Sequence, residues 1–574
     1  MDSRSAAHVL SQIAAFLELA GENRFKSRAY QTAARSLLAL AADDLGALLR
    51  SGELAKVRGL GPATLAVVRD LVETGESRSL EQLREATPEG LLELMSVPGL
   101  GIEKIHKLHA EIGIASLADL EAAAQDGRLA KVKGMGPKTA QKILKGIGFM
   151  RDAGVMSLYP HAAVEANALV ASIRSHPDVV RAEIAGSIRR RREVIADIDI
   201  VAACAHAPAE VAQSFTRIAG VRSASGAGGA VSIRYIDGTR MDLYCVEPEN
   251  FAVALWRATG SADHIEAVGR RLASRGMRLA GDSLLDKRGR PIPCGDEAAV
   301  YAAAALAQIP PELREGLGEV EAAASRTLPH LVELSDLQGV LHCHSQYSDG
   351  KATIAEMASA ARAKGWSYIG ISDHSQAAFY ASGVAREAML EQHDEIDALN
   401  ASLSDFRVLK GVEADILADG RLDYDAELLD RFDYVIASIH SRFKMDGNAM
   451  TERVLRAMDD PHMTVLAHPT GRLLLSRDAY AIDVEAVLEK AADTGVAIEV
   501  NADPHRLDLD WRYLHRAKDL GVTIEIGPDA HSRGGLEWTE LGVAMARKGW
   551  TERSDVLNAR SATDVVAFAQ RRFK

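Results

Sequence analysis

The sequence predicts a multidomain protein with an all-α N-terminal region, an α+β middle region and a C-terminal barrel in which strands alternate with helices. Three observations support this fold class. Glycine-containing repeats, each followed by a helical run, occupy the first 150 residues. A strand carrying two aspartates and a hairpin signal follow in the middle of the chain. Short apolar runs, about seven in number, then alternate with helical stretches over residues 338–574.

Length and composition limit the class of protein. With 574 residues the chain is too long for one core, so we expect three or more domains. It contains no apolar run of membrane-spanning length and no apolar signal stretch near Met1. Its four cysteines form no Cys-x-x-Cys pair, which is typical of a reducing compartment. We therefore expect a cytoplasmic protein with no membrane partner; no feature indicates an oligomer, and a monomer is assumed.

The net charge of −13 is unevenly distributed along the chain. Residues 1–300 hold 38 Lys and Arg against 36 Asp and Glu, whereas residues 301–574 hold 29 against 44. The N-terminal half can therefore present local basic surfaces to phosphate, as at the run Arg189–Arg192. The overall negative charge does not exclude a nucleic-acid partner.

Three short repeats organise the N-terminal region. They read Val57-Arg-Gly-Leu-Gly-Pro, Val97-Pro-Gly-Leu-Gly-Ile and Val132-Lys-Gly-Met-Gly-Pro, and they resemble the helix-hairpin-helix motif. The glycines let the hairpin approach a phosphate, and the next helix offers free N–H groups and the positive end of its dipole. Such contacts bind the DNA backbone without reading sequence. The residues expected to contact DNA are Gly59, Gly61, Gly99, Gly101, Gly134, Gly136 and Lys138.

The middle region presents three carboxylates to one face of a predicted sheet. Asp197 and Asp199 alternate with apolar residues in one strand and therefore point to the same side. Asp237-Gly238 is a hairpin signal between two further strands, and this hairpin places Asp242 beside the first strand. Because three neighbouring carboxylates repel one another, the pattern favours a site for Mg²⁺ or a similar hard cation.

Side chains that commonly bind metal ions (His, Asp and Glu) follow successive apolar runs in the C-terminal region. Examples are Gly339-Val-Leu-His-Cys-His344, Val408–Glu413, Tyr434–His440 and Thr464–His468. Helical stretches such as 353–364 and 483–495 lie between the runs, and Val496–Val500 is a further strand. Parallel strands that each end in such a residue predict a metal site at the C-terminal face of a barrel. Imidazoles with carboxylates suit Zn²⁺, Mn²⁺ or a related ion, which indicates a metal-dependent hydrolase.

These residues resemble the ligand set of the PHP (polymerase and histidinol phosphatase) domain family. The resemblance implies a distorted (β/α)7 barrel with up to three Mn²⁺ or Zn²⁺ ions. Asp373 is expected to support the site as a hydrogen-bond acceptor, and Cys343 to face away from its neighbouring ligands. Arg442 and Arg472 are either phosphate-binding residues or solvated surface residues. The implied ligands are His342, His344, Asp349, His374, Glu413, His440, His468, Asp529 and His531.

The middle region resembles the nucleotidyltransferase palm of family X DNA polymerases. The matching pattern is Gly186-Ser187, Arg189-Arg190, Asp197-x-Asp199 and Asp242, and Thr259-Gly260-Ser261 resembles the thumb motif. The resemblance implies that Asp197, Asp199 and Asp242 are the catalytic ligands of two Mg²⁺ or Mn²⁺ ions. It also implies that Gly186, Ser187, Arg190, Gly260 and Ser261 bind the incoming dNTP.

The whole chain resembles the bacterial version of this family, which carries an appended PHP domain. Arg28-Ala-Tyr30 and Ile309–Glu315 match segments of its N-terminal domain and of the region before PHP. The expected domains are an N-terminal helical domain at 1–80, fingers-like helices at 81–150, the palm at 151–248, the thumb at 249–318, a short packed linker at 319–337 and the PHP domain at 338–574.

The sequence departs from the family pattern at three places, two of which concern selection of the incoming nucleotide. Ile265 replaces an Asn that contacts the incoming base, and Arg257-Ala258 replaces an aromatic pair that excludes the ribose 2′-hydroxyl. We therefore expect looser base and sugar discrimination; Arg257 is an alternative contact to phosphate or template. The stretch Ala63–Arg69 also lacks the Lys that deoxyribose-phosphate lyase chemistry requires.

The resemblance implies a DNA polymerase that fills short gaps in base-excision repair and trims 3′ ends with its PHP domain. Its expected partners are gapped or primer-template DNA and dNTPs, and its expected location is the cytoplasm, on the nucleoid when bound to DNA. One alternative is chiefly a DNA end-processing nuclease (3′ exonuclease, 3′-phosphatase or abasic-site endonuclease) with a weak palm. The other is a small-molecule phosphatase whose N-terminal domains only bind.

Overall fold

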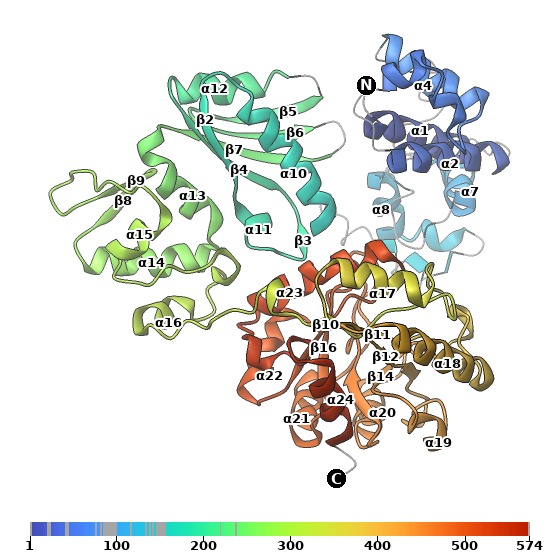
Figure 1. Cartoon of the computed structure of the whole chain (residues 1–574). Coiled ribbons are helices and arrows are strands. Elements are labelled where there is room, and N and C mark those ends of the chain that lie inside the picture. The colour runs from blue at the N-terminus through green and yellow to red at the C-terminus, as the bar shows by residue number, and fades with distance from the viewer. Residues whose placement is uncertain are drawn as a thin grey trace. The chain divides into compact units, whose positions relative to one another are not determined.

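The computed structural model of the chain divides into two compact units, Met1–Gly154 and Val155–Lys574, which are described separately (Figure 1). No helix among the described residues is long and apolar enough to cross a membrane. The described residues are 3–19, 24–40, 45–74, 77, 79–80, 83, 94, 100, 102–114, 117–132, 135–136, 139–140, 143–144, 156–218, 220–235 and 238–571.

Helices make up the described part of the first unit, as predicted. Two apolar cores stabilise it, one built around Leu10, Leu37 and Val68 and the other around Ile105 and Leu120. The elements are α1 (Ser3–Leu19), α2 (Arg24–Leu40), α3 (Leu45–Arg50), η1 (Leu54–Lys56), α4 (Pro62–Thr74), α7 (Ile102–Ile112), α8 (Leu117–Gln125) and η2 (Leu129–Lys131).

The palm begins the second unit and is built on a five-stranded sheet. The strand order is β2-β4-β7-β6-β5, in which β4 and β7 are parallel and the other neighbours are antiparallel. Helices α10 and α12 lie against this sheet (Figure 1). The elements are β1 (Ser157–Leu158), α10 (Tyr159–Arg174), β2 (Val179–Ile184), α11 (Gly186–Arg189), β3 (Val194–Ile195), β4 (Ile198–Cys204), α12 (Pro208–Phe215), β5 (Val221–Ala227), β6 (Ala230–Tyr235) and β7 (Arg240–Val246).

The thumb follows the palm and has its own apolar core around Trp256 and Tyr301. Residues 319–337, expected as a linker, contain helix α16, and Val332 there is fully buried and donates its N–H to the carbonyl of Thr551. The connection is therefore packed. The elements are η3 (Pro248–Asn250), α13 (Phe251–Thr259), α14 (Ala262–Ser274), β8 (Arg278–Ala280), β9 (Ser283–Leu285), α15 (Glu297–Ala303), η4 (Pro311–Leu313) and α16 (Glu319–Ser325).

The C-terminal region is a distorted barrel of parallel strands in two sheets, ordered β10-β11-β12 and β13-β14-β15-β16-β17. Single bridges, Cys343 with Ala530 and His374 with Glu413, connect the two sheets. The strands are β10 (Gly339–Val340), β11 (Tyr368–Ile371), β12 (Arg407–Lys410), β13 (Glu413–Asp415), β14 (Val435–Ser438), β15 (Met463–Leu466), β16 (Ala497–Asn501) and β17 (Ile524–Gly527).

Helices surround these strands (Figure 1). The predicted helical stretches 353–364 and 483–495 are α17 and α21; Thr353 and Glu356 form a capping box at the first, and Asp483 caps the second. The helices are α17 (Ile354–Ala363), α18 (Arg386–Ser402), α19 (Ala426–Leu429), α20 (Gly447–Ala457), α21 (Val484–Thr494), α22 (Leu514–Asp519), α23 (Thr539–Lys548) and α24 (Ala562–Gln570).

The strand predicted over Val408–Glu413 is divided in the structure. It breaks between β12 and β13 at Gly411-Val412, where the chain passes the ring of Tyr434. A Cβ on Gly411 would lie 2.2 Å from Cζ of that ring, so the glycine is needed for the close approach. This break is where the barrel departs from a regular cylinder.

Candidate active sites

The palm brings its three aspartates together at one end of two neighbouring interior strands, β4 and β7. The parallel pairing of β4 with β7 sets Asp199 directly beside Asp242, and Asp197 lies immediately before β4. Burial and the charges of the other two carboxylates raise the pKa of Asp199 to about 7. Burial and Asp242 likewise raise the pKa of Asp197. Such mutual repulsion is relieved when a divalent cation binds between the carboxylates.

Gly186 is the first residue of the short helix α11 and lies beside these aspartates. Its φ is +60°, and a Cβ there would lie 1.8 Å from Oδ2 of Asp199. The neighbouring Ala185 N–H donates to the backbone carbonyl of Asp199 at 2.8 Å. Ser187 Oγ is buried and has no hydrogen-bond partner among the described residues, which is unusual for a buried hydroxyl.

Arg190, the arginine predicted to bind triphosphate, is held by two groups. Its Nε donates to Glu315 at 3.1 Å and its NH1 to the backbone carbonyl of Thr259 at 2.7 Å. Thr259 also accepts a hydrogen bond from Arg189 through its hydroxyl at 2.8 Å. These contacts tie the end of α11 to the beginning of the thumb motif.

The thumb residues Gly260 and Ser261 form the turn between α13 and α14. Ser261 Oγ caps α14 by accepting from the N–H of His264 at 3.2 Å. A Cβ on Gly260 would lie 2.7 Å from Ile265, which makes this turn tight. Arg257 NH1 donates to the carbonyl of Gly281 at 3.0 Å, so its guanidinium is held within the thumb.

Some of the glycines predicted to bind DNA lie among the described residues. Gly59 has a φ of +98°, and a Cβ there would lie 2.5 Å from Ser36 Oγ, which explains the glycine. Gly61 and Gly136 have open space around the Cβ position, consistent with an approaching phosphate. Gly61 directly precedes the first residue of α4, Pro62. Gly99, Gly101, Gly134 and Lys138 lie outside the described residues.

The barrel brings all nine of its predicted ligands together in one cluster. Among the described residues, four sets of side chains offer ligand atoms within 4.8 Å of one another, and together they include every predicted ligand. The sets are His344, Asp349, His374 and His531; His342, Glu413 and His468; His342, His344 and Asp529; and His374, Glu413 and His440.

Glu413, at the start of β13, is the centre of this cluster. Its Oε2 lies 3.3 Å from His342 Nε2 and 2.9 Å from His374 Nδ1. Its Oε1 lies 2.9 Å from His468 Nε2 and 3.3 Å from His440 Nε2. Although burial opposes ionisation, these imidazoles hold the pKa of Glu413 well below its usual range. Glu413 thus directs one carboxylate oxygen toward each pair of imidazoles, a combination of groups that suits divalent metal ions.

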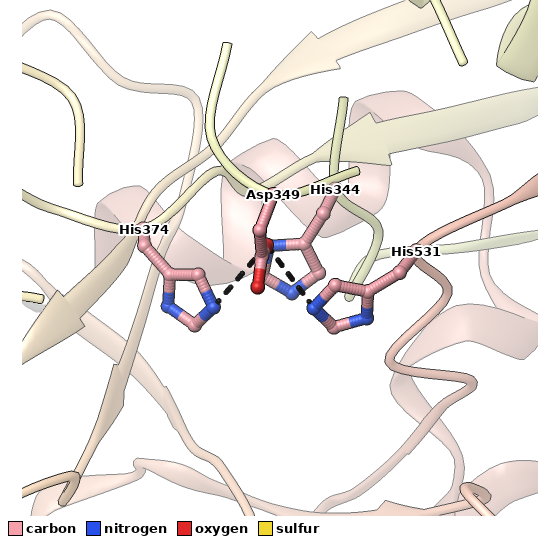
Figure 2. A group of neighbouring side chains, drawn as sticks. All are labelled: His344, Asp349, His374 and His531. Carbon is pink, nitrogen blue, oxygen red and sulfur yellow. Dashed lines mark ion pairs between the residues drawn. The ribbon is translucent and has the colours of Figure 1, made fainter. Parts of the chain in front are cut away.

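Two further carboxylates complete the cluster. Asp349 Oδ1 lies 3.7 Å from His374 and 3.2 Å from His531. Figure 2 marks both ion pairs with dashed lines. Asp529 Oδ1 lies 3.2 Å from Nε2 of His344. Burial and the charges of His531 and His374 lower the pKa of His344 to about 3, so its imidazole is neutral and keeps a lone pair for a metal. Both ring nitrogens of His344 are buried without a hydrogen-bond partner among the described residues. The donor set therefore fits divalent ions.

A second layer of acids orients the imidazoles. Glu499 on β16 accepts from His342 Nδ1 at 2.5 Å and from the N–H of His468 at 2.6 Å. Asp415 lies 2.8 Å from His440 Nδ1. Asp373 instead accepts from the N–H of Ser345 at 2.8 Å and so holds the loop that leads to Asp349. Sequence reasoning missed Glu499 and Asp415; the available signal was an acid inside an otherwise apolar strand.

Seven of the nine predicted ligands, all except His342 and His344, line a cavity of about 350 Å³ that is also lined by Phe443, Arg477 and Arg506. Arg506 lies 3.4 Å from Asp529 Oδ2, and Arg477 stacks 4.3 Å above the Phe443 ring. Neither arginine considered from the sequence lines this cavity. Arg472 donates to Asp510 and to backbone carbonyls of the loop that carries Arg506, so its role there is to hold that loop. Arg442 also lies outside the lining.

Comparisons with known proteins match individual domains of the chain and also the chain as a whole. Family models match as "PHP domain" over residues 341–503, "SAM-like Helix-hairpin-helix tandem" over 91–148, "Helix-hairpin-helix domain" over 1–77 and "DNA polymerase beta thumb" over 254–315. The "DNA polymerase/3'-5' exonuclease PolX" of Bacillus subtilis is 38% identical over 578 residues, which covers 100% of both chains.

Other relatives match within a shorter part of the chain. A "Probable phosphatase" of Syntrophotalea carbinolica is 30% identical over 168 residues, which is 28% of this chain and 64% of that protein. A "Probable phosphatase" of Clostridium acetobutylicum is 39% identical over 100 residues, covering 17% and 38% of the two chains. The domain models define a PHP domain, a metal-dependent hydrolase type, joined to a polymerase β-type thumb. By its full-length similarity, the chain belongs to the bacterial family X DNA polymerases with a C-terminal PHP domain.

Proposed function

We propose that this chain is a DNA-directed DNA polymerase that fills short gaps in base-excision repair and whose PHP domain removes nucleotides from 3′ ends. The observation that carries the proposal is the presence of two separate candidate metal centres. One is the set of three palm aspartates beside Gly186, and the other is the nine-residue cluster at the barrel's C-terminal face. The name of the full-length relative, "DNA polymerase/3'-5' exonuclease PolX", supports both activities.

In the palm, Asp197 and Asp199 would hold two Mg²⁺ or Mn²⁺ ions and Asp242 would join one of them. Two such ions stabilise the attacking 3′-hydroxyl and the leaving pyrophosphate during nucleotide transfer. Gly186 lets the α11 backbone lie against Asp199. The unpartnered hydroxyl of Ser187 is placed to donate to a phosphate oxygen. We assign Arg190 to the same triphosphate and Gly260-Ser261 to the thumb turn that bounds the nucleotide.

In the barrel, the nine ligands would hold up to three Mn²⁺ or Zn²⁺ ions. Ions so placed supply hydroxide near neutral pH and neutralise the charge on a phosphodiester. Glu499 fixes the ring of His342, and Asp415 fixes that of His440, through their second nitrogens. Arg477 and Arg506 add positive charge to the cavity, and Phe443 offers an aromatic face. These groups suit a nucleotide at a DNA end.

The proposed partners are gapped or primer-template DNA, held through the helix-hairpin-helix glycines, and dNTPs. We further propose a monomeric, cytoplasmic protein that is associated with the nucleoid when it is bound to DNA. We also propose domain boundaries at residues 80, 150, 248, 318 and 337, and the ligand roles given above.

A second candidate function is a DNA end-processing nuclease with a weak palm. Arg257, Ala258 and Ile265 favour it, because they replace groups that select the incoming nucleotide. The "Probable phosphatase" relatives favour a 3′-phosphatase activity of the barrel.

A panel of DNA substrates tests these functions. Wild-type protein is incubated with Mn²⁺ or Mg²⁺ on a one-nucleotide gap with dNTPs, on a 3′-overhang, on a 3′-phosphate end and on an abasic site, and with histidinol phosphate. We expect gap filling and release of nucleotides from 3′ ends. End processing without gap filling would favour the second candidate, and hydrolysis of histidinol phosphate without any action on DNA would refute both.

A further inference from the structure

A lysine of the barrel contacts the nucleotide-binding part of the palm. Lys548 ends helix α23, and its side chain is fully buried. Its Nζ donates to the backbone carbonyl of Arg190 at 2.9 Å, to the carbonyl of Glu312 at 3.2 Å and to the carboxylate of Glu315 at 2.6 Å. The Nζ also lies 4.4 Å above the ring of Trp511. One ammonium group of the PHP domain thus contacts both the palm and the end of the thumb.

The carboxylate of Glu315 is shared among three cations. Lys548 lies 2.6 Å from it, Arg190 3.1 Å and Arg192 3.4 Å. Although burial opposes ionisation, the charges of Lys548 and Arg190 lower the pKa of Glu315. Because the carboxylate is only 6% exposed, solvent does not compensate for a cation that leaves it. The strength with which Glu315 holds Arg190 therefore depends on the other two cations.

The carbonyl contact fixes the backbone as well as the charge. Arg190 is the C-cap residue that directly follows α11, and the first residue of this helix, Gly186, lies against Asp199. A lysine that donates to the last carbonyl of a helical turn holds the end of that turn. Lys548 is therefore bound to the residue that caps the four-residue turn carrying Gly186 and Ser187.

We propose that Lys548 of the PHP domain is a positioning residue for the incoming nucleoside triphosphate in the palm. It neutralises Glu315 and fixes the end of α11, so that the guanidinium of Arg190 can exchange its contact with Glu315 for a contact with phosphate. Without this ammonium group, Glu315 keeps its ion pair with Arg190. The positive charge of Arg190 is then not available to the triphosphate. The inference depends on the proposed function, because it assigns the triphosphate to Arg190.

The test measures the KM for dNTP and kcat in one-nucleotide gap filling by the full-length chain. We expect Lys548→Met to raise the KM about tenfold, the size of effect typical of removing one buried charged partner, with kcat changed about twofold or less. The matched control is Arg547→Met. Arg547 is the neighbouring residue on α23 and also forms an ion pair with Glu312, at 2.7 Å, but its other hydrogen bond is to the carbonyl of Val332 and not to Arg190 or Glu315. Its substitution should leave the KM unchanged.

A double variant separates positioning from simple packing. In Lys548→Met with Glu315→Gln, the competing carboxylate is removed together with the lysine, so the KM should return to within about threefold of wild type. Glu315→Gln alone, which keeps the lysine, should not raise the KM. Thermal melting of each variant shows whether it folds. If Lys548→Met does not fold, the test rests on Glu315→Gln, whose KM should not rise.

Several results would overturn the inference. They are an unchanged KM in Lys548→Met, an equal rise in Arg547→Met, no recovery in the double variant, or a rise in Glu315→Gln as large as that in Lys548→Met. If wild-type protein does not extend the primer at all, the proposed polymerase function fails and this inference fails with it. Extension by wild type with an unchanged KM in the lysine variant refutes this inference alone.

Discussion

Gly186→Ala is predicted to stop nucleotide transfer while leaving the fold and the barrel intact. The added Cβ would lie 1.8 Å from Oδ2, 2.6 Å from Cγ and 2.8 Å from Cβ of Asp199. Because carbon atoms in contact lie about 3.5 Å apart or more, either the carboxylate or α11 must shift by roughly 1.5 Å. A displacement of about 1 Å at a reacting group costs about 100-fold in rate, so we expect kcat to fall at least about 100-fold.

The same substitution also strains the backbone, because Gly186 has a φ of +60°. Placing a side chain in this region costs about 1–2 kcal/mol. Gly228→Ala is the matched control: Gly228 lies in the β5–β6 turn with a φ of +63°, and its Cβ position has no atom within 4 Å. It introduces similar strain in the same domain without crowding a carboxylate.

The assay is single-turnover filling of a one-nucleotide gap, with thermal melting and 3′-end trimming measured on the same preparations. We expect both variants to melt slightly earlier than wild type, both to trim, and only Gly186→Ala to lose extension. Extension by Gly186→Ala within threefold of wild type would refute the crowding argument. An equal loss in Gly228→Ala would assign the effect to strain.

Three further predictions follow from the structure. Although burial opposes ionisation, Arg512 holds the pKa of Glu193 at about 2, and the carboxylate also accepts from Trp511. Because the folded pKa lies below the unfolded one, its stabilisation is present above about pH 5 and is lost as the pH falls toward 2. Denaturant unfolding should show Glu193→Gln less stable by roughly 3 kcal/mol at pH 7, with a difference that shrinks below pH 5; a pH-independent difference would contradict this. Glu499→Gln should weaken metal binding by the barrel about 10- to 100-fold, measured by competition with a chelator, because it removes the carboxylate acceptor of a ligand's imidazole; unchanged affinity would contradict the role given to Glu499. Helix α4 (Pro62–Thr74) contains no lysine, so borohydride should trap little covalent adduct with a deoxyribose-phosphate end, and strong trapping would show that an amine elsewhere serves.

The sequence predicted the fold class and the groups of residues that come together, because the signals were local. Most of the predicted barrel ligands follow an apolar run, and the ends of parallel strands meet at one face of a barrel, so spacing together with the family resemblance predicted that His342, Glu413 and Asp529 lie together. The same reasoning placed Asp242 beside Asp199, since the hairpin fixes which strand returns to the sheet.

Other features could not be predicted because they depend on contacts between distant residues. Glu499 lies within a buried strand, where neither its reach to His342 nor its distance from the solvent is visible from spacing. Arg477 and Arg506 enter the cavity from loops, whose course no periodic pattern fixes. The contact of Lys548 with Arg190 joins residues 358 positions apart and required the packing of α23 against the palm.

The central claim is that one chain carries two independent catalytic centres. The most direct measurement follows a 5′-labelled primer in a one-nucleotide gap, with Mn²⁺ and with or without dNTPs, for wild type, Asp197→Ala and His342→Ala. We predict that Asp197→Ala loses extension and keeps 3′ trimming, whereas His342→Ala keeps extension and loses trimming. Loss of both activities in either variant, or trimming without extension in wild type, would contradict the claim.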